Sequence, residues 1–267
     1  MTSSAVVPSV REMRLYPVQV ARAVAISPHL RRVTVTGAEL TGFPFAGPDQ
    51  RVKLMLPHPG EDILRFDGAT TIPEFLALPV DTRPIMRTYT VRHHRPAAAE
   101  LDIDFALHGD PAHAGPASRW ATTARPGDPA ALYGPAASYA PPADTQWQLI
   151  AGDESALPAV AAILERRPDR VAAQALIEVP DTDDRQPLGR CGTIVSWFSR
   201  DGEPAHESRR LLDAVRDLTL PAGPGYVWLA GESGVVTALR RHLVNDRGLD
   251  RDRITFTGYW RHGHAEN

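Results

Sequence analysis

The pattern of apolar and polar positions divides the chain into two halves of different character. In the first half, short runs alternate apolar and polar residues between proline and glycine breaks, at residues 15–25, 30–36 and 50–56. A period of two is typical of strands that bury one face. Residues 87–92 and 101–107 continue the pattern around a basic tip and predict a hairpin. We therefore predict an N-terminal antiparallel β-barrel.

The second half alternates strand-like and helix-like segments instead. Buried-type strands are expected at residues 147–151, 171–179, 193–198, 226–230 and 253–260, with helices at 155–166, 207–218 and 235–244. This order predicts a doubly wound α/β domain with a parallel sheet. A stretch rich in proline and alanine, residues 135–146, separates the two patterns. We therefore expect one domain at residues 1–140 and a second at residues 141–267.

Composition limits what kind of protein this is. A chain of 267 residues with 43% hydrophobic and 23% charged residues has the make-up of a globular protein with two cores. The net charge of −3 provides no general basic field, so nucleic acid is not expected as a partner. No run approaches the roughly 20 apolar residues that span a bilayer, and no signal segment opens the chain. A cytoplasmic monomer without membrane contact is the default expectation.

Metal and disulfide sites are not expected either. Cys191 is the single cysteine, which excludes a disulfide framework, a four-cysteine iron–sulfur cluster and a cysteine-based zinc site. We expect it to be a small buried residue. His262 and His264 form an H-x-H pair near the C-terminus, but no third ligand is evident, so the pair is interpreted as facing solvent.

The run Arg87-Thr88-Tyr89-Thr90 carries the first chemical signal. Alternate residues of a strand point to the same face, so Arg87 and Tyr89 lie on one side. Such an edge offers a bidentate cation for a phosphate, an aromatic face for a planar heterocycle and a hydroxyl for a ring nitrogen. A flavin dinucleotide has all three groups. An ordinary barrel strand with surface arginines remains the alternative.

Glycine-rich turns supply further candidates. Gly115-Pro116-Ala117-Ser118 enters a predicted helix, and free N–H groups at a helix start bind phosphate, although a simple proline-initiated helix is an equal alternative. Small residues also follow two predicted parallel strands, at 152–159 and 231–234. Ligands of parallel sheets bind at such carboxyl ends. Neither segment is a G-x-G-x-x-G fingerprint, which argues against a dehydrogenase-type dinucleotide fold.

Taken in order, six motifs resemble the siderophore-interacting proteins, the FAD-dependent ferric-siderophore reductases of the ferredoxin-NADP reductase superfamily. The resemblance runs from about residue 14 to the C-terminus. The motifs are Arg87-Thr88-Tyr89-Thr90-Val91-Arg92, Asp104-Phe105 with Leu107-His108-Gly109, Gly115 to Ala121, Ala151 to Pro158, Ala230-Gly231-Glu232 and Gly258 to Gly263.

The resemblance implies a role for each motif. Arg87 would bind the FAD pyrophosphate, Tyr89 would pack on the isoalloxazine ring, and Thr90 would hydrogen-bond near the reactive N5, which makes Tyr89 and Thr90 the catalytic candidates. Further FAD-binding positions are Thr88, His108, Gly109, Gly115, Ala117 and Ser118. The nicotinamide cofactor, NAD(P)H, would be framed by Asp153, Glu154, Ser155, Ala230, Gly231 and Glu232. Tyr259 and Trp260 would lie near the flavin.

The resemblance also implies a ferric siderophore as the substrate. Reduced nicotinamide would pass hydride to the flavin, and the flavin would reduce the bound Fe(III). Many ferric siderophores are anionic, so the candidates for docking are basic: Lys53 and Arg261, with Arg92 and His264 behind them. A solvated strand residue and a frayed tail are the alternatives for the first two.

The electron donor stays open at this point. Asp181, Asp183 and Asp184 follow a predicted strand and mildly favour NADH, whereas Arg185 and Arg209 would favour a 2′-phosphate. Some relatives in this family take electrons from ferredoxin. Two other functions remain open: a general flavin or ferric-chelate reductase, and a binding module for ferric siderophore or FAD that catalyses nothing.

Overall fold

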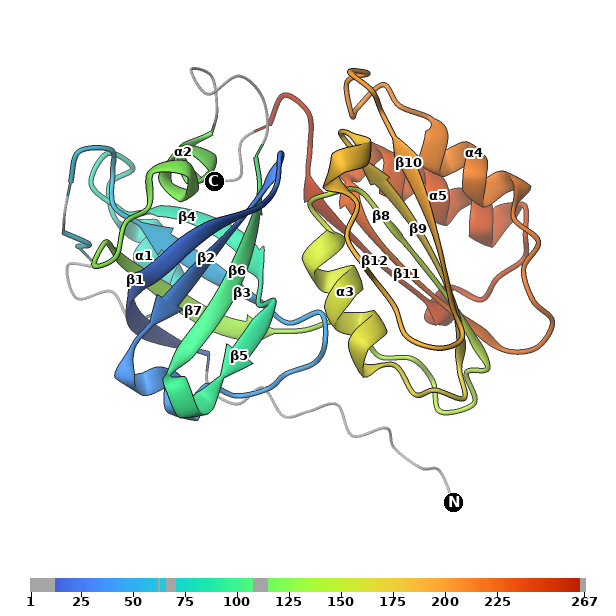
Figure 1. Cartoon of the computed structure of the whole chain (residues 1–267), viewed down its shortest axis with the longest axis horizontal. Coiled ribbons are helices and arrows are strands. Elements are labelled where there is room, and N and C mark those ends of the chain that lie inside the picture. The colour runs from blue at the N-terminus through green and yellow to red at the C-terminus, as the bar shows by residue number, and fades with distance from the viewer. Residues whose placement is uncertain (1–12, 62, 66–70, 108–114, 265–267) are drawn as a thin grey trace.

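The structure is a computed structural model that describes residues 13–61, 63–65, 71–107 and 115–264. Two sheets with their helices lie beside one another (Figure 1). The chain passes from one sheet to the other between Ala136 and Trp147, and the boundary predicted at residue 140 falls within this stretch. No helix in these described segments is long and apolar enough to cross a membrane.

The first sheet is antiparallel and has the strand order β4-β3-β7-β1-β2-β6-β5. The strands alternate buried and exposed residues, and the residues on one face pack in a common apolar core. Ala117 and Ala121 of α2 belong to the same core. The short α1 covers part of the other face through Phe75. The strands are β1 (Arg14–Ser27), β2 (Leu30–Thr36), β3 (Arg51–Leu56), β4 (Ile85–Thr90), β5 (His93–Arg95), β6 (Glu100–Ala106) and β7 (Pro129–Ala136), and the helices are η1 (Ala38–Gly42), α1 (Ile72–Ala77), η2 (Pro96–Ala98) and α2 (Pro116–Thr123).

The predicted hairpin between residues 87–92 and 101–107 is wrong. β4 pairs with β3, and β6 pairs with the three-residue β5 and with β2. β4 ends at Thr90, and the strand that pairs with β6 is β5, which begins at His93 opposite Asp102. The alternation continues across this break, so periodicity alone did not reveal it. β4 is therefore an edge strand of this sheet.

The second sheet is parallel, in the order β10-β9-β8-β11-β12. α3 packs on one face and α4 and α5 pack on the other, as predicted for a doubly wound sheet. Cys191 is exposed on the loop before β10, so its predicted burial is wrong. The elements are β8 (Trp147–Gly152), α3 (Leu157–Arg166), β9 (Ala172–Val179), η3 (Thr182–Asp184), β10 (Thr193–Ser199), α4 (Arg210–Asp217), β11 (Gly225–Glu232), α5 (Ser233–Asn245), η4 (Arg251–Arg253) and β12 (Ile254–Trp260).

The tip of the β1–β2 hairpin joins the two halves. Leu30 is only 1% exposed because it lies in the apolar core that α3 makes with the parallel sheet. Beside it, Ser27 and His29 contact Asp184 of η3. Asp49, in the loop before β3, makes a second link by accepting a hydrogen bond from Trp228 Nε1 at 3.3 Å. The two halves are therefore held together at several points.

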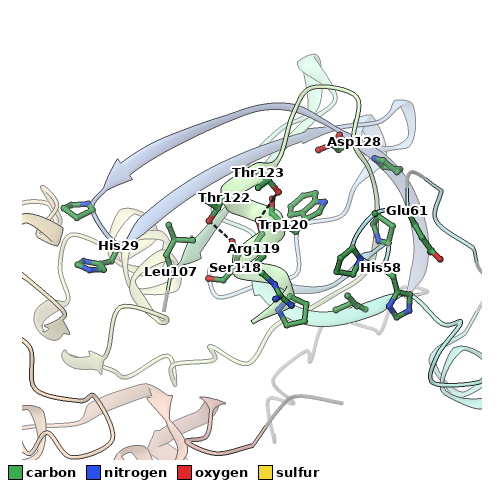
Figure 2. A pocket seen from close by; sticks show the side chains of 17 residues that line it. His29, His58, Glu61, Leu107, Ser118, Arg119, Trp120, Thr122, Thr123 and Asp128 are labelled. Carbon is green, nitrogen blue, oxygen red and sulfur yellow. Dashed lines mark hydrogen bonds between the residues drawn. The ribbon is translucent and has the colours of Figure 1, made fainter. Parts of the chain in front are cut away.

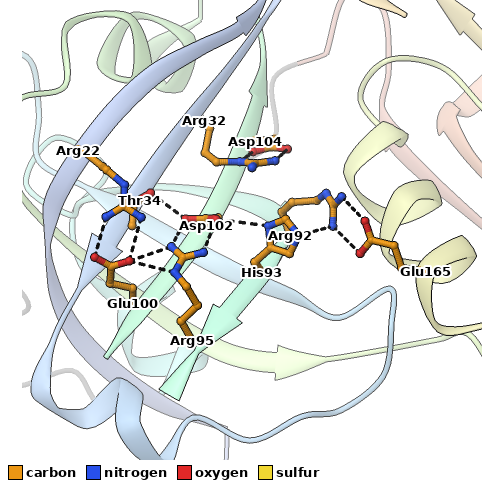
Figure 3. Close-up of polar contacts among 10 residues, drawn as sticks. All are labelled: Arg22, Arg32, Thr34, Arg92, His93, Arg95, Glu100, Asp102, Asp104 and Glu165. Carbon is orange, nitrogen blue, oxygen red and sulfur yellow. Dashed lines mark hydrogen bonds and ion pairs between the residues drawn. The ribbon is translucent and has the colours of Figure 1, made fainter. Parts of the chain in front are cut away.

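A cluster of charged residues covers the β2–β6–β5 wall of the antiparallel sheet (Figure 3). Asp102 is its centre and accepts hydrogen bonds from Thr34 and from both terminal nitrogens of Arg95. Burial works to raise the pKa of Asp102, but hydrogen bonds from Arg95, His93 and Thr34 outweigh burial and hold the pKa well below its ordinary range. These charges are therefore paired within the wall.

Candidate functional site

A cavity of about 750 Å³ lies around α2, between the β1–β2 turn and the segment after β3 (Figure 2). This volume is within the range of small-molecule sites. Its lining residues are Pro28, His29, Pro57, His58, Pro59, Gly60, Glu61, Ile85, Leu107, Pro116, Ser118, Arg119, Trp120, Thr122, Thr123, Asp128 and Pro129.

The start of α2 presents polar groups to this cavity. Gly115 is the N-cap residue and has no side chain to cap the helix, and Pro116 follows as the first helical residue. The hydroxyl of Ser118 is buried and has no hydrogen-bond partner among the described residues. A buried hydroxyl without a partner costs stability. An orphan hydroxyl beside the positive end of a helix therefore fits an anionic ligand.

Ile85, Arg87 and Tyr89 form a row along one face of β4. Ile85 lines the cavity, and the other two follow at two-residue steps along the same edge strand. The Tyr89 ring lies 4.3 Å from that of Phe105, and Phe105 lies 5.8 Å from Trp120 of α2. Neither Arg87 nor Tyr89 lines the cavity itself, so the row leads away from it.

The Arg87 side chain makes few contacts with the described residues. Its guanidinium donates one hydrogen bond, of 2.7 Å, to the carbonyl oxygen of Met86, and no carboxylate pairs with it within the described segments. A half-buried arginine with this single contact keeps most of its five N–H groups for a ligand. The row therefore offers a cation between the cavity and the aromatic ring of Tyr89.

The opposite face of β3 and β4 carries the other predicted residues. Lys53 lies opposite Thr88, and its Nζ donates to the Thr88 hydroxyl at 2.7 Å. Arg51 lies opposite Thr90 one step further along. The side chains of Thr90 and of Tyr259 in β12 lie close enough to interact, so β4 and β12 approach each other here. Burial raises the pKa of the Tyr259 phenol above its ordinary value, although the interaction with Thr90 lowers it.

Asp153 organises the strand ends of the parallel sheet. It is 6% exposed and follows β8. One carboxylate oxygen accepts hydrogen bonds from the backbone N–H and hydroxyl of Ser155. The other accepts from the Glu232 N–H at 2.8 Å and from Trp260 Nε1 at 2.9 Å. Asp153 therefore ties the ends of β8, β11 and β12 to one another.

The neighbouring glutamates are engaged in the same way. Glu154 is 1% exposed and forms a bidentate ion pair with Arg200, with both distances 2.7 Å. Arg200 also contacts Glu178, whose pKa is raised by burial although Ser208 and Arg200 hydrogen-bond to it. Glu232 caps α5 by accepting from two backbone N–H groups. Both oxygens of Glu154 are thus engaged within the fold, whereas the two hydrogen bonds to Glu232 use one of its oxygens, Oε2.

Close backbone approach explains the small residues at these strand ends. A Cβ on Gly231, where φ is +142°, would lie 2.6 Å from an oxygen of Asp153. A Cβ on Gly152 would lie 2.4 Å from the carbonyl oxygen of Ala230. The predicted positions Asp153, Ser155, Ala230 and Gly231 thus meet at one edge, and the glycines allow the strands to pack.

The basic candidates have different environments. Arg92 is 9% exposed and forms a bidentate ion pair with Glu165 of α3, so the expectation that it docks substrate is replaced by a contact between the two halves. Arg261 is exposed two residues beyond Tyr259. Lys53 is half-buried beside Thr88. His108 and Gly109 lie outside the described residues.

One further expectation changes. Asp184 is fully buried and bonded to Ser27 and His29, so it does not face a nicotinamide cofactor. His262 and His264 are both exposed, as expected, and His262 also stacks on His206 at 3.5 Å between ring centroids. Across the described part of the chain, no group of three or more His, Cys, Asp and Glu side chains is placed to hold a metal ion.

Sequence reasoning missed several residues of the cavity. His29, His58 and Trp120 line it, although none was assigned a role. Arg119 and Trp120 belong to a motif that was singled out, so a helical projection from Ser118 could have suggested them. His29 and His58 lie in turns far apart in sequence, and no local pattern marks them.

The antiparallel FAD-side sheet and the parallel sheet together form a ferredoxin-reductase-like fold. Residues 19–139 match the siderophore-interacting FAD-binding domain, and residues 145–263 match the siderophore-interacting protein family. The chain is 34% identical to the ferric vibriobactin reductase of Vibrio cholerae, over 95% of this chain and 92% of that protein. It is 31% identical to the NADPH-dependent ferric-chelate reductase of Escherichia coli, over 93% and 94% of the two chains.

A solved structure agrees with these relatives. The siderophore-interacting protein SipS from Aeromonas hydrophila superimposes with a TM-score of 0.79 at 36% identity, covering 95% of this chain and 94% of that one. The chain therefore belongs to the siderophore-interacting protein family, and its first half is that family's FAD-binding domain.

Proposed function

We propose that this protein is an FAD-dependent ferric-siderophore reductase that uses NAD(P)H as its electron donor. The observation that carries the proposal is the orphan hydroxyl of Ser118 at the start of α2, beside a cavity large enough for part of a dinucleotide. Because this half is the family's FAD-binding domain, the residues at hand fit that cofactor.

The described residues divide the work of binding. Arg87 would hold the pyrophosphate together with the N–H groups of Ala117 and Ser118, and Gly115 leaves room for it. Tyr89 would support the ring system, and Thr88 would position Lys53 through their hydrogen bond. Thr90, which lies next to Tyr259, would meet the edge of the ring. The chemistry that FAD supplies when bound is the uptake of two electrons as hydride and their release one at a time.

The proposed substrate is Fe(III) held by an anionic siderophore. The relative from Vibrio cholerae carries ferric vibriobactin in its name, which supports this class of substrate. Lys53 and Arg261 supply positive charge beside β4 and beyond β12. Fe(II) is bound less tightly than Fe(III) by hard oxygen ligands, so reduction releases the iron from the siderophore.

NADPH is favoured over NADH as the donor. The relative from Escherichia coli is named as NADPH-dependent. With Asp184 buried against His29, one of the three carboxylates that favoured NADH is removed from consideration, while Arg185 remains near Ser199 at the end of β10. Ferredoxin is the alternative donor. A cytoplasmic location is part of the proposal, because a single cysteine suits a reducing compartment.

Absorption spectra of the purified protein test the proposal. We expect flavin bands after FAD is added, bleaching under anaerobic NADPH, and recovery when a ferric siderophore is then supplied. A protein that takes up neither FAD nor FMN would end the proposal. Bleaching without recovery by any ferric siderophore, but with recovery by ferric citrate, would indicate a general ferric-chelate reductase. Flavin binding without bleaching by NADPH, NADH or reduced ferredoxin would indicate a binding module.

Lys53→Ala tests the docking surface separately. We expect weaker affinity for a ferric catecholate with unchanged FAD affinity, because Lys53 of β3 lies beside Thr88, on the face of the sheet opposite to that of Arg87 and Tyr89. An unchanged Michaelis constant for the ferric complex would place the docking surface elsewhere.

A further inference from the structure

His29 lies where the cavity meets the second half of the molecule. It is the second residue of the turn between β1 and β2, and its side chain lines the cavity together with Pro28 (Figure 2). The next residue, Leu30, is buried in the core of the parallel-sheet half. The same short segment is thus a wall of the cavity and a contact between the halves.

A buried carboxylate fixes the orientation of the His29 ring. Asp184, which is fully buried in η3, accepts from the His29 backbone N–H at 2.9 Å and faces Nδ1 at 2.7 Å. It also accepts from the Ser27 hydroxyl at 2.6 Å. A carboxylate has no proton to give, so Nδ1 must carry the hydrogen of this bond. The ring is therefore held in one orientation with Nε2 as its second polar atom.

Nε2 is the atom available to a ligand. The His29 side chain is 43% exposed, although Asp184 has no exposed surface at all. Nε2 has no hydrogen-bond partner within the described segments, whereas Nδ1 has one. A neutral ring would accept a hydrogen bond from a hydroxyl at this position, and a charged ring would donate one to a phosphate.

The row along β4 indicates which part of the cofactor would reach His29. In the proposed function, Tyr89 supports the flavin ring and Arg87 holds the pyrophosphate. Ile85 continues the row past Arg87 and lines the cavity in which His29 lies. The cavity is therefore at the end of the row that the adenosine side of the dinucleotide would occupy, where ribose hydroxyls and phosphate oxygens are the polar groups.

From this geometry we infer that His29 binds the ADP moiety of FAD and that Asp184, on the other half of the molecule, positions it for that contact. The inference rests on the proposed function. It makes cofactor binding depend on a residue of the parallel-sheet half that does not line the cavity. Asp184 is accordingly a positioning residue.

Titration of flavin fluorescence with FAD and with FMN, which lacks the adenosine part, tests the inference. For His29→Ala we expect the dissociation constant for FAD to rise about five- to tenfold, as for the loss of one hydrogen bond. The constant for FMN should stay within about twofold of the wild-type value. His29→Gln should recover part of the loss, because its amide can replace Nε2.

Asp184→Asn tests the positioning role. The NH2 group that replaces one carboxylate oxygen cannot accept from Nδ1–H, so the tautomer that leaves Nε2 as an acceptor is no longer held and FAD affinity should fall about threefold or more. The double variant should bind FAD like His29→Ala alone, because the two residues act through one contact. Asp183→Asn is the matched control, since it makes the same change on an exposed neighbour in η3.

Three results would overturn the inference. One is unchanged FAD affinity in His29→Ala with a lower melting temperature, which would make His29 a contact between halves alone. The second is equal weakening of FAD and FMN. The third is additive losses in the double variant. A wild-type protein that binds no flavin would instead contradict the proposed function, so the two failures can be told apart.

Discussion

The FAD-binding half and the strand ends of the parallel sheet use polar residues in opposite ways. In the first half, Ser118 beside the cavity has a buried hydroxyl without a partner among the described residues, and Arg87 on the adjoining row of β4 has one backbone contact. At the strand ends, Asp153 and Glu154 are buried and fully engaged with neighbouring residues. Unsatisfied groups mark where a ligand is required, whereas satisfied ones mark what the fold itself requires.

The comparison predicts that substitutions at the strand ends act on folding. Arg200→Met should show the largest effect, a loss of about 3–5 kcal/mol in the free energy of unfolding, because it leaves Glu154 and Glu178 buried without their counter-charge. Urea unfolding measures the loss. Arg210→Met is the control, since its pair with Glu203 is exposed and should cost less than about 1 kcal/mol. Equal losses in the two variants would contradict the comparison.

Substitutions at the cavity and on the adjoining row of β4 should act on cofactor binding instead. Arg87→Ala should raise the dissociation constant for FAD about 10- to 100-fold, as expected for charge-assisted hydrogen bonds to phosphate. The cofactor-free protein should keep its stability, because Arg87 contacts only a backbone carbonyl among the described residues. Isothermal titration and urea unfolding separate the two effects. Arg125→Ala changes an exposed arginine after α2 and should leave both values unchanged.

The Asp102 cluster shows that engaged charges occur in the first half as well, on the wall of Figure 3. Asp102→Asn should cost about 2 kcal/mol at pH 7. The pKa of Asp102 in the folded state lies below its value of about 3.9 in the unfolded chain. Its contribution to stability is therefore complete above about pH 5 and falls as the pH drops below about 4.

Urea unfolding at pH 7, 5 and 3 checks this expectation for Asp102. The difference between wild type and variant should narrow at pH 3 and stay constant between pH 5 and 7. Glu39→Gln, at an exposed ion pair with Arg14, should show a smaller difference at every pH. A difference that does not change with pH would mean that the cluster does not control the titration of Asp102.

Ser118→Ala has the smallest expected effect, but it separates ligand binding from stability most clearly. Ser118→Ala should weaken FAD binding about three- to tenfold, yet leave the cofactor-free protein equally stable or slightly more stable, because a buried orphan hydroxyl is removed. Thr41→Ala is the control, in η1. The exposed Thr41 hydroxyl donates to the Ala38 carbonyl oxygen at 3.0 Å and does not line the cavity, so its loss should not change FAD affinity. A stability loss in Ser118→Ala would mean that its hydroxyl is not an orphan.

Local patterns predicted the two halves and where their strands lie along the chain, because alternation and helical periodicity report burial directly. They did not predict strand pairing, since the break between Thr90 and His93 keeps the same period. They drew attention to the segment that contains Asp153 and Glu154, because it follows a predicted strand. They did not predict the residues to which these two side chains hydrogen-bond. Glu154 meets Arg200, which is 46 positions away, and such contacts depend on tertiary structure.

The candidate site divides along the same line. Arg87, Tyr89 and Ser118 were found from sequence because strand and helix geometry places them locally. Arg92 was assigned to the substrate because its charge was visible and its partner Glu165, 73 positions away, was not. His29 gave no signal, because its importance comes from Asp184, which is 155 positions away.

The seating of Leu30 in the core of the second half has a consequence for engineering chimaeras within this family. If the halves of two relatives were exchanged at residue 140, the β1–β2 hairpin tip of one protein would pack against the apolar core of the other protein's second half. A single junction at residue 140 therefore separates residues that pack together. A chimaera should take residues 26–30 and residues 141–267 from the same parent protein.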